Sequence, residues 1–377
     1  MKILANPFLI SNYVSKEYFC NRENELQQLI RNAKNNANTT LISSRRLGKT
    51  GLIFRLFELL GEENDMATVY VDIYASRNIE DFISLLADAI LKKFPERTPV
   101  GKQLLKILRG FRAVFTYDDM SGAPQVQFNY RTSGDKEYTL QQLLQFLDRQ
   151  PLPVLVAIDE FQQIAEYPEK NMEALLRTQI QQLKNVQFIF SGSKQHTLVE
   201  IFTNAKRPFY ASTQFITLTA IDKEKYRGFI RAHFETGKRS IDDEAIEYIL
   251  NWTNTYTYYT QFVCNRVYFH KKINVEIVKQ ECAAILREQE PVFLQYRKLL
   301  TVKQWDLLVA LAKEERLYQL YSKDFLLRHK LGSPSSIKRL ADALIEKEMI
   351  LEETTTGDTS YRVYDVFLMR WLQRTYQ

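Results

Sequence analysis

The strongest chemical pattern in this chain of 377 residues is a loop of eight residues between a strand-like run and a helix-like run. It reads Ser43-Ser44-Arg45-Arg46-Leu47-Gly48-Lys49-Thr50. Loops of this kind wrap backbone N–H groups around a phosphate, and the N-terminus of the following helix adds partial positive charge. Gly48 would let the backbone approach closely, Lys49 would reach the β- and γ-phosphates, and the Thr50 hydroxyl would ligate Mg²⁺. A Gly-Lys-Thr that opens a helix by chance is the alternative when the loop is taken alone.

A second pattern, later in the chain, agrees with the first. Residues 154–158 form a continuous hydrophobic run, and Asp159 and Glu160 follow it directly. Charges at the tip of a buried strand are costly unless they face a site. We expect Asp159 to hold Mg²⁺ through water and Glu160 to orient and deprotonate an attacking water. A solvated strand end explains one acid, but a pair downstream of a phosphate loop indicates phosphate chemistry.

The segments around these motifs predict an α/β domain with a buried parallel sheet. Five runs rich in β-branched and aromatic residues are nearly continuous, which indicates strands covered on both faces. Amphipathic stretches lie between them, and this alternation is typical of an α/β fold. The predicted strands are 39–43, 68–73, 153–158, 187–191 and 214–218, and the predicted helices are 22–35, 49–60, 79–94, 140–149 and 172–184.

Changes in the pattern along the chain predict three domains. The α/β core covers 1–221 and carries a β-hairpin insertion at about 113–130, with its turn at Ser121-Gly122. Residues 222–290 have lost the strand signal and predict an all-α unit. Its expected helices are 241–252, 257–271 and 274–289.

The last predicted domain, 291–377, has the order of a winged helix-turn-helix: three helices and then a two-stranded hairpin. The third helix is expected to begin at Pro334, with Ser333 as its N-cap. The other expected elements are helices at 302–313 and 322–328 and wing strands at 349–353 and 361–364.

The third of these helices is a candidate surface for a partner. Ser335, Lys338 and Arg339 are expected to face outward, where they suit phosphate contact or base reading in a DNA major groove. Acidic residues follow closely, so the domain lacks the strongly basic surface of a dedicated DNA binder. Double-stranded DNA and a protein therefore both stay open as partners. The expected buried stripe is Ile337, Leu340 and Leu344, and the nearby acids are Asp342, Glu346, Glu348, Glu352 and Glu353.

The phosphate loop and the acidic strand together resemble those of AAA+-type P-loop ATPases. The likeness is strongest to the archaeal-type ATPase family, related to STAND NTPases, whose loops have the form Pro-Arg-Arg-x-Gly-Lys-Thr. It covers nearly the whole chain and implies a core with a five-stranded parallel sheet, a helical lid and a C-terminal winged helix. It also implies ATP or ADP with Mg²⁺ as cofactors, bound between the core and the lid.

The resemblance assigns further residues to the nucleotide. Segment 19–26 is similar to the family's Phe-x-x-Arg-Glu-x-Glu-Leu segment beside the adenine, which places Phe19, Asn21 and Arg22 there. Ser191 and Ser193 fall at the family's sensor 1 position, where either could touch the γ-phosphate or the attacking water. The expected catalytic set is Glu160, Lys49, Ser191 and Ser193. The expected loop contacts are Ser44, Arg45, Arg46, Leu47, Gly48, Lys49, Thr50 and Gly51.

The sequence also departs from the family pattern. The usual first glycine of the loop is Ser43, a small residue that should fit at a strand end. The family's Tyr-Gly-Arg after sensor 1 is replaced by 208–212, which leaves Arg207 as the nearest candidate for an arginine finger. The lid sequence 254–259 lacks the family's glycines and proline, and its aromatic residues are consistent with lid core. Arg45 and Arg46 could contact phosphate or a neighbouring protomer, or lie in solvent.

Composition excludes several other classes of protein. With 45% hydrophobic and 25% charged residues, the chain matches a globular protein rather than a disordered or fibrous one. No apolar run reaches the ~20 residues that span a bilayer. Three distant cysteines and four histidines without ligand spacing argue against disulfides and a dedicated metal site, so we expect a cytoplasmic protein. A net charge of +6 permits a nucleic-acid partner without demanding one.

Two functions therefore follow from the sequence. The first is a switch that hydrolyses ATP to ADP and phosphate and couples lid motion to the winged helix. The second is a nucleotide-gated DNA- or protein-binding regulator with little or no turnover. The missing arginine favours slow turnover, whereas the intact acidic pair favours hydrolysis. Oligomerisation is compatible with both.

Overall fold

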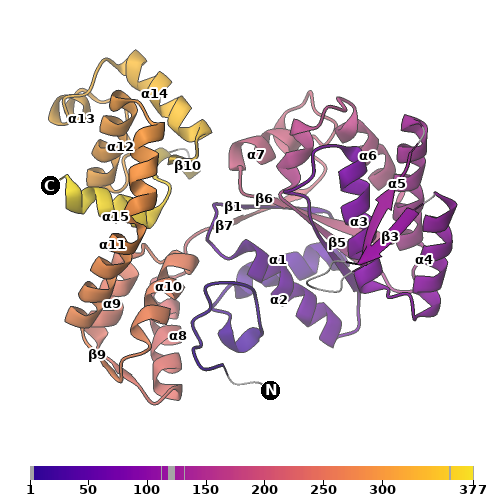
Figure 1. Ribbon diagram of the computed structural model, residues 1–377, viewed down its shortest axis with the longest axis horizontal. Helices are drawn as coiled ribbons and strands as arrows, with labels where there is room; N and C mark the ends of the chain where they lie inside the picture. The colour runs from indigo at the N-terminus through magenta and orange to yellow at the C-terminus, as the bar shows by residue number, and fades with distance from the viewer. Residues whose placement is uncertain (1–3, 112, 118–123, 131, 356–357, 377) are drawn as a thin grey trace. The chain divides into compact units, whose positions relative to one another are not determined.

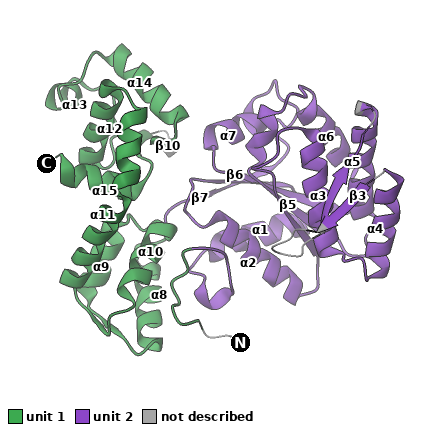
Figure 2. Ribbon diagram, in the orientation of Figure 1, with its two compact units in different colours: residues 1–10, 221–377 green, residues 11–220 purple. Residues whose placement is uncertain are grey.

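The computed structural model describes residues 4–111, 113–117, 124–130, 132–355 and 358–376. The chain forms two compact units, which are shown in different colours in Figure 2. The first unit contains residues 1–10 and 221–377, and the second contains residues 11–220. Each unit has its own core and is described by itself.

The second unit is built on a five-stranded sheet in the order β2-β5-β6-β1-β7, and every neighbouring pair is parallel (Figure 1). The three central strands are buried along their whole length, as their continuous apolar runs predict. The predicted α/β fold class with a five-stranded parallel sheet is therefore confirmed. The strands are β1 (Thr39–Ser43), β2 (Ala67–Asp72), β5 (Val154–Asp159), β6 (Val186–Gly192) and β7 (Gln214–Leu218).

Helices cover both faces of this sheet, as Figure 1 shows. On one face lie α1 (Glu23–Lys34) and α2 (Lys49–Glu62). The other face packs against α3 (Ile79–Lys93), α5 (Ser133–Asp148), α6 (Met172–Gln182) and α7 (Gln195–Thr203). The three central strands therefore have apolar partners on both sides. The edge strands differ from the prediction of burial on both faces, because β7 is exposed at three of its five residues and β2 alternates buried with half-buried ones.

Two helices of this unit were not predicted, and a third is longer than predicted. The unpredicted ones are α4 (Pro99–Gly110) and α7, although each buries a short apolar stripe at helical spacing. Helix α5 begins seven residues before the predicted start because Thr132 and Asp135 form a reciprocal capping box there.

The predicted hairpin insertion is present as β3 (Ala113–Tyr117) and β4 (Pro124–Phe128), paired antiparallel. It forms a separate two-stranded sheet rather than an edge of the five-stranded one. Val126 and Phe128 are buried in the core on the α3 side, and the backbone N–H of Val126 donates to Asp88 Oδ1 on α3 at 2.6 Å. The predicted turn at 121–122 lies outside the described residues.

The first unit begins with a helical lid. Its helices are α8 (Lys223–Thr236), α9 (Asp243–Trp252), α10 (Thr257–Val267) and α11 (Val275–Leu299). Helix α8 was not predicted. The short strands β8 (Ser240–Ile241) and β9 (Lys272–Ile273) pair in parallel within this region.

Residues 4–10 pack with the lid, although the sequence placed this segment in the α/β core. Phe8 is buried and its ring lies 5.0 Å from that of Phe234 and 5.7 Å from that of Tyr268. Asn6 Nδ2 donates to the Asn265 carbonyl at 3.0 Å, and Asn265 Nδ2 donates to the Phe8 carbonyl at 2.7 Å. Burial of the Phe8 ring accounts for the difference between the predicted and the observed placement of this segment. A contact between residues so far apart in the chain leaves no local pattern in the sequence.

The winged helix has the predicted order of elements and one further helix at its end. Its helices are α12 (Val302–Glu314), α13 (Lys323–Arg328), α14 (Pro334–Glu346) and α15 (Val366–Thr375), and its wing strands are β10 (Ile350–Thr355) and β11 (Asp358–Val363). Ser333 precedes α14 as predicted, but its hydroxyl contacts Ser335 Oγ and makes no cap bond.

The lid and the winged helix share a continuous core, because α11 runs through Pro291 and so across the predicted boundary at 290 and 291. Phe367 on α15 lies 5.6 Å from Trp252, 4.7 Å from Tyr259 and 5.4 Å from Phe262, between ring centroids. Arg370 Nε donates to the Trp252 carbonyl at 2.9 Å, at the end of α9. These contacts hold the lid and the winged helix together as one body.

Candidate functional site

The predicted phosphate loop connects β1 to α2 at the carboxyl end of the sheet. Two residues turn the chain with positive φ, Arg46 at 71° and Gly48 at 89°. At Gly48 the value favours glycine, because a Cβ is strained in that conformation. Ser43 is fully buried as the last residue of β1, and its hydroxyl donates to the Ser44 carbonyl at 2.8 Å. The loop thus accommodates a serine where the family usually has its first glycine.

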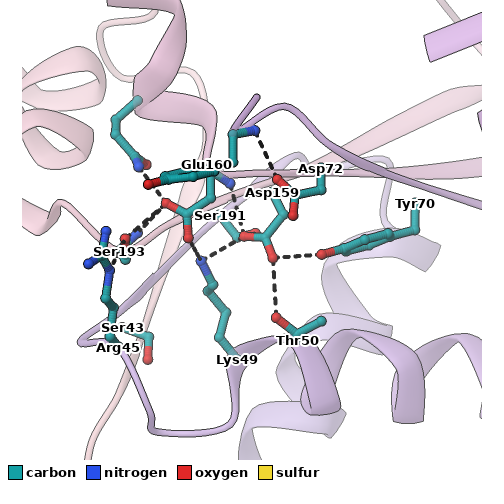
Figure 3. A network of polar contacts seen from close by, with 12 residues as sticks. Ser43, Arg45, Lys49, Thr50, Tyr70, Asp72, Asp159, Glu160, Ser191 and Ser193 are labelled. Carbon is teal, nitrogen blue, oxygen red and sulfur yellow. Dashed lines mark hydrogen bonds and ion pairs between the residues drawn. The ribbon is translucent and has the colours of Figure 1, made fainter. Parts of the chain in front are cut away.

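Lys49 joins this loop to the acidic end of β5, as Figure 3 shows. Its Nζ lies 2.6 Å from Asp159 Oδ1 and 3.2 Å from Glu160 Oε1. The lysine and aspartate side chains are only 10% and 4% exposed. The lysine and the two carboxylates stabilise one another. Without Lys49, each carboxylate would be an unpaired charge in a poorly solvated place.

The two oxygens of Asp159 have separate sets of partners. Oδ2 accepts from the Thr50 hydroxyl at 3.2 Å and from the Tyr70 hydroxyl at 2.8 Å. Oδ1 contacts Lys49 and accepts from the Ser191 hydroxyl at 2.8 Å. Burial acts to raise the pKa of Asp159, but the Lys49 charge and these hydrogen bonds outweigh it and hold the pKa below its ordinary value. The carboxylate is therefore ionised and fixed in orientation.

Glu160 is held by a second set of donors. Its Oε2 accepts from the Ser193 hydroxyl at 2.9 Å and from Gln162 Nε2 at 2.5 Å. Burial opposes ionisation, but the Lys49 charge and the bonds from Gln162 and Ser193 lower the pKa of Glu160 overall. The residue has a φ of 57°, a left-handed conformation that is rare outside glycine and is often found at functional sites.

A glycine makes room for one of these donors. A Cβ built on Gly192 would lie 1.8 Å from Gln162 Oε1, so a larger residue here would displace this amide from its place beside the end of β6. Gln162 is held next to Glu160 by the hydrogen bond that its Nε2 donates. The side chains around the acid are therefore packed as well as hydrogen-bonded.

A third carboxylate, Asp72, ends the neighbouring strand. It lies opposite Asp159 in the β2–β5 register and accepts from the Tyr74 backbone N–H at 2.9 Å. Burial raises its pKa, and the charges of Asp159 and Glu160 raise it further. Asp72 therefore takes up a proton more readily than an ordinary aspartate.

The segment assigned to the adenine side also reaches the loop. Arg22 is buried; one guanidinium nitrogen donates to the carbonyls of Leu47 at 3.2 Å and Thr219 at 2.6 Å. The Phe19 ring packs beside Gly51, 3.7 Å from where a Cβ would be. Asn21, like Arg22, has positive φ. Arg22 thus fixes the loop to the end of β7, a positioning role that the sequence did not indicate.

Other loop residues connect to β6 and α7. Arg45 Nε donates to the Ser193 hydroxyl at 3.2 Å, and the Ser44 hydroxyl accepts from Gln195 Nε2 at 3.0 Å. Arg207, the candidate arginine finger, forms ion pairs with Glu173 at 2.7 Å and Glu200 at 3.4 Å in its own unit. The structure therefore brings the loop, the β5 acids and the β6 serines together and leaves Arg207 in a separate salt-bridge group.

Sequence reasoning missed four polar side chains at this site. Tyr70 and Asp72 belong to β2, and they could be assigned only once β2 was known to lie beside β5. Gln162 and Gln195 each lie three residues after the last residue of a site strand, β5 and β6. Their closeness to these strand ends in the sequence was a weak signal that could have identified them. Their contacts with Asp159, Glu160 and Ser44 show that the site extends beyond the motifs.

The predicted surface of the winged helix is present on α14. Ser335, Lys338 and Arg339 are exposed, and no described residue forms an ion pair with Lys338 or Arg339. Leu340 is half-buried rather than buried, because Ala341 takes its place in the core. The buried stripe of α14 is Ile337, Ala341 and Leu344.

The described part of the chain lacks two further kinds of feature. It contains no group of three or more His, Cys, Asp or Glu side chains that could hold a metal ion. None of its helices is both long and apolar enough to cross a membrane.

Comparison with known families agrees with this geometry. Residues 19–260, more than half of the chain, match the family described as an ATPase domain predominantly from Archaea. The chain belongs to this archaeal ATPase family. Residues 291–374 of this ATPase-family chain match a family described as a probable winged helix domain. No curated protein matches significantly.

Solved structures similar to this archaeal-type ATPase share its fold over nearly its whole length. The Walker-type ATPase PABY2304 of Pyrococcus abyssi has a TM-score of 0.66 at 18% identity, covering 97% of this chain and 99% of its own. The Aeropyrum pernix ORC2 protein has a TM-score of 0.56 at 14% identity, covering 98% and 96%. The ORC1 protein of the same organism, solved in complex with DNA, has a TM-score of 0.51 at 13% identity, covering 98% and 97%. At these identities the likeness concerns the fold alone.

Proposed function

We propose that this protein binds ATP with Mg²⁺ at the phosphate loop, hydrolyses it, and uses the cycle as a switch. The observation that carries the proposal is the position of Lys49 Nζ, 2.6 Å from Asp159 and 3.2 Å from Glu160. It brings the phosphate-binding lysine together with Asp159 at the end of β5 and Glu160 directly after it. Membership of an ATPase family supports the same function.

The donor set at this point suits magnesium. The Thr50 hydroxyl and the Asp159 carboxylate lie 3.2 Å apart, and both are hard oxygen ligands of the kind that Mg²⁺ prefers. These two residues would hold the metal, which when bound neutralises charge on the β- and γ-phosphates. Lys49 would then exchange its carboxylate partners for phosphate oxygens. Ser44 to Gly51 would surround the phosphates, with Phe19, Asn21 and Arg22 on the adenine side.

Glu160 is the proposed base. Its lowered pKa keeps it ionised at neutral pH, and its bonds from Ser193 and Gln162 hold the carboxylate in place. In that state it can orient a water and accept its proton. Ser191 acts on Asp159 and Ser193 on Glu160, so we assign both serines a positioning role in catalysis.

The test is ATP turnover in the wild type and two variants. Glu160→Gln should bind ATP normally but lose about 10²–10⁴ in rate, the usual cost of losing a general base. Lys49→Ala should lose most of its ATP affinity, measured by calorimetry, because the phosphate charge is no longer neutralised. Unchanged ATP affinity in Lys49→Ala would overturn the phosphate-loop assignment. A Glu160→Gln variant that keeps most of the wild-type rate would remove Glu160 as the base.

A nucleotide-gated regulator with little turnover is the second candidate. The ion pairs of Arg207 with Glu173 and Glu200 favour it, because they occupy the nearest candidate for an arginine finger. A single-turnover measurement separates the two candidate functions. A nucleotide-gated regulator would keep its bound ATP intact, whereas an ATP-hydrolysing switch would convert it to ADP. In both cases we place the protein in the cytoplasm, consistent with three buried cysteines that form no disulfide.

We further propose that the winged helix transmits the nucleotide state to a partner, duplex DNA or protein, through α14. If the partner is DNA, Lys338→Ala with Arg339→Ala should weaken binding at every sequence. The slope of log affinity against log salt should fall by about 1.8, since each lost phosphate contact contributes about 0.9. Equal duplex affinity in the double variant, or no wild-type binding at low salt with any nucleotide, rejects DNA in favour of a protein.

A further inference from the structure

A pocket of about 390 Å³ lies in the winged helix, between the segment that joins α12 to α13 and strand β11. Three of its lining residues are tyrosines, Tyr318, Tyr321 and Tyr361. Tyr318 and Tyr321 are 57% and 40% exposed, whereas Tyr361 is largely buried. The rings of Tyr318 and Tyr321 are therefore accessible to a ligand.

The walls of this pocket are fixed to the fold. Leu317 and Tyr361 exchange two backbone hydrogen bonds, of 2.9 and 2.8 Å, which join the connecting segment to β11. Leu320 is buried, and the Ser322 hydroxyl caps α13 by accepting from the Phe325 N–H. A ligand would therefore find the pocket already formed and would not have to order it.

A carboxylate, that of Glu352, contacts the wall of the pocket. The Tyr361 hydroxyl donates to Glu352 Oε1 at 2.6 Å, from the directly opposite position on β10. Glu352 and Asp358 are the exposed charged side chains of the described wing strands. Arg362 is half-buried, and both it and Arg316 pair with Glu353 rather than with Glu352. A phosphate backbone is disfavoured here, whereas a cation is attracted.

We propose that this pocket binds a lysine or arginine side chain presented by a protein partner. The faces of Tyr318 and Tyr321 attract a cation through their ring quadrupoles, and the Glu352 carboxylate completes the site. The protein already uses this interaction internally, with the Arg239 guanidinium 4.0 Å from the centroid of Tyr268. The site is separate from the α14 surface and does not depend on ATP hydrolysis.

Two double variants distinguish binding to the aromatic ring faces from binding to apolar volume alone. Tyr318→Leu with Tyr321→Leu removes the rings but keeps apolar volume, whereas Tyr318→Phe with Tyr321→Phe keeps the rings. Glu352→Gln removes the charge but keeps an acceptor for Tyr361. Matched controls are Tyr210→Leu, an exposed tyrosine of the other unit, and Glu346→Gln, an exposed acid on α14. Circular dichroism and tryptophan fluorescence check that each variant is folded.

The probe is a short fluorescein-labelled peptide of alternating arginine and glycine, followed by fluorescence anisotropy at low salt. A glutamate–glycine peptide and a short DNA duplex are measured in parallel. The leucine pair should weaken arginine-peptide binding by about 10-fold, and the phenylalanine pair should retain it. Glu352→Gln should cost about 2- to 5-fold, and the controls should change little.

Several outcomes overturn the proposal. These are no binding of the arginine peptide by the wild type, equal binding by the leucine pair, or phenylalanine variants as weak as the leucine ones. A leucine pair that loses affinity for the duplex instead of the peptide would assign the pocket to nucleic acid.

Discussion

Two regions of this protein differ in what they bury. The nucleotide-site region of the 11–220 unit buries charge, since Lys49, Asp159 and Glu160 meet at the ends of its strands. In the other unit the junction of lid and winged helix buries aromatic rings, with Phe367 among Trp252, Tyr259 and Phe262. Burying charges costs desolvation free energy, so buried charges are retained where the chemistry needs them. Burying aromatic rings stabilises the folded state directly.

This difference indicates separate roles for the charged site and the aromatic junction. Buried ion pairs are weak evidence of stability, because desolvation offsets most of their attraction. Packed rings add both area burial and favourable ring geometry. We therefore expect substitutions in the aromatic junction to affect folding, and substitutions in the charged site to affect ligand binding.

The largest expected effect on stability is in the aromatic junction. Phe367→Ala should lower the free energy of unfolding of its unit by about 3–5 kcal/mol, because it removes a buried ring and leaves a cavity. All three tryptophans, Trp252, Trp305 and Trp371, belong to this unit, so intrinsic fluorescence during denaturation follows it selectively. Phe269→Ala, at a ring that is 80% exposed, is the control. Equal losses in the two variants would contradict a packed junction.

A smaller effect is expected from the acid beneath the hairpin. Burial raises the pKa of Asp88 from 3.8 to about 7, although the Val126 N–H opposes this. Between these values the folded protein binds more protons than the unfolded chain, so its stability falls as pH rises from about 4 to 7. Asp88→Asn should remove that dependence and stabilise the protein at neutral pH by about 1–4 kcal/mol.

The measurement is urea denaturation at several pH values, followed by circular dichroism and by tryptophan fluorescence. The circular dichroism transition, to which both units contribute, should shift in Asp88→Asn. The fluorescence transition should not, because the tryptophans lie in the other unit. A variant with the same pH dependence as the wild type would show that Asp88 does not titrate in this range.

The smallest effect is expected at Tyr70, where the site meets β2. Tyr70→Phe removes the hydroxyl that donates to Asp159 Oδ2, the oxygen shared with Thr50. One lost hydrogen bond to a charged group is worth about 1.5–3 kcal/mol at most. We expect ATP-dependent thermal stabilisation to need roughly 3- to 30-fold more Mg²⁺, with little change in its maximum.

Tyr167→Phe is the matched control for this prediction. It also loses a buried tyrosine hydroxyl bond, to Ser76 Oγ, in the same unit. Its Mg²⁺ dependence should equal that of the wild type. If both variants shift alike, the effect is a general loss of packing rather than the orientation of Asp159.

The sequence predicted the parts of the molecule whose signals are local. The central strands were found because both of their faces are buried. Lys49, Asp159 and Glu160 were found because each follows or begins an element. Tyr70 and Asp72 depend on strand order, which a run of residues does not reveal. Phe8 packs more than two hundred residues away along the chain, on Phe234 and Tyr268. Such contacts are set by tertiary burial, which overrides local pattern.

Helix α11 is a long, continuous connection between the lid and the winged helix. At 1.5 Å per residue its 25 residues extend about 37 Å, from the lid helices to the start of the winged helix. A tilt of about 10° at its lid end would carry its other end through about 6 Å on that length. Trp371 braces the helix on both sides of Pro291, through Glu290 at 3.2 Å and Phe293 at 5.5 Å between rings. If ATP binding rotated the lid, this helix would enlarge a small rotation into a displacement comparable to one helical turn.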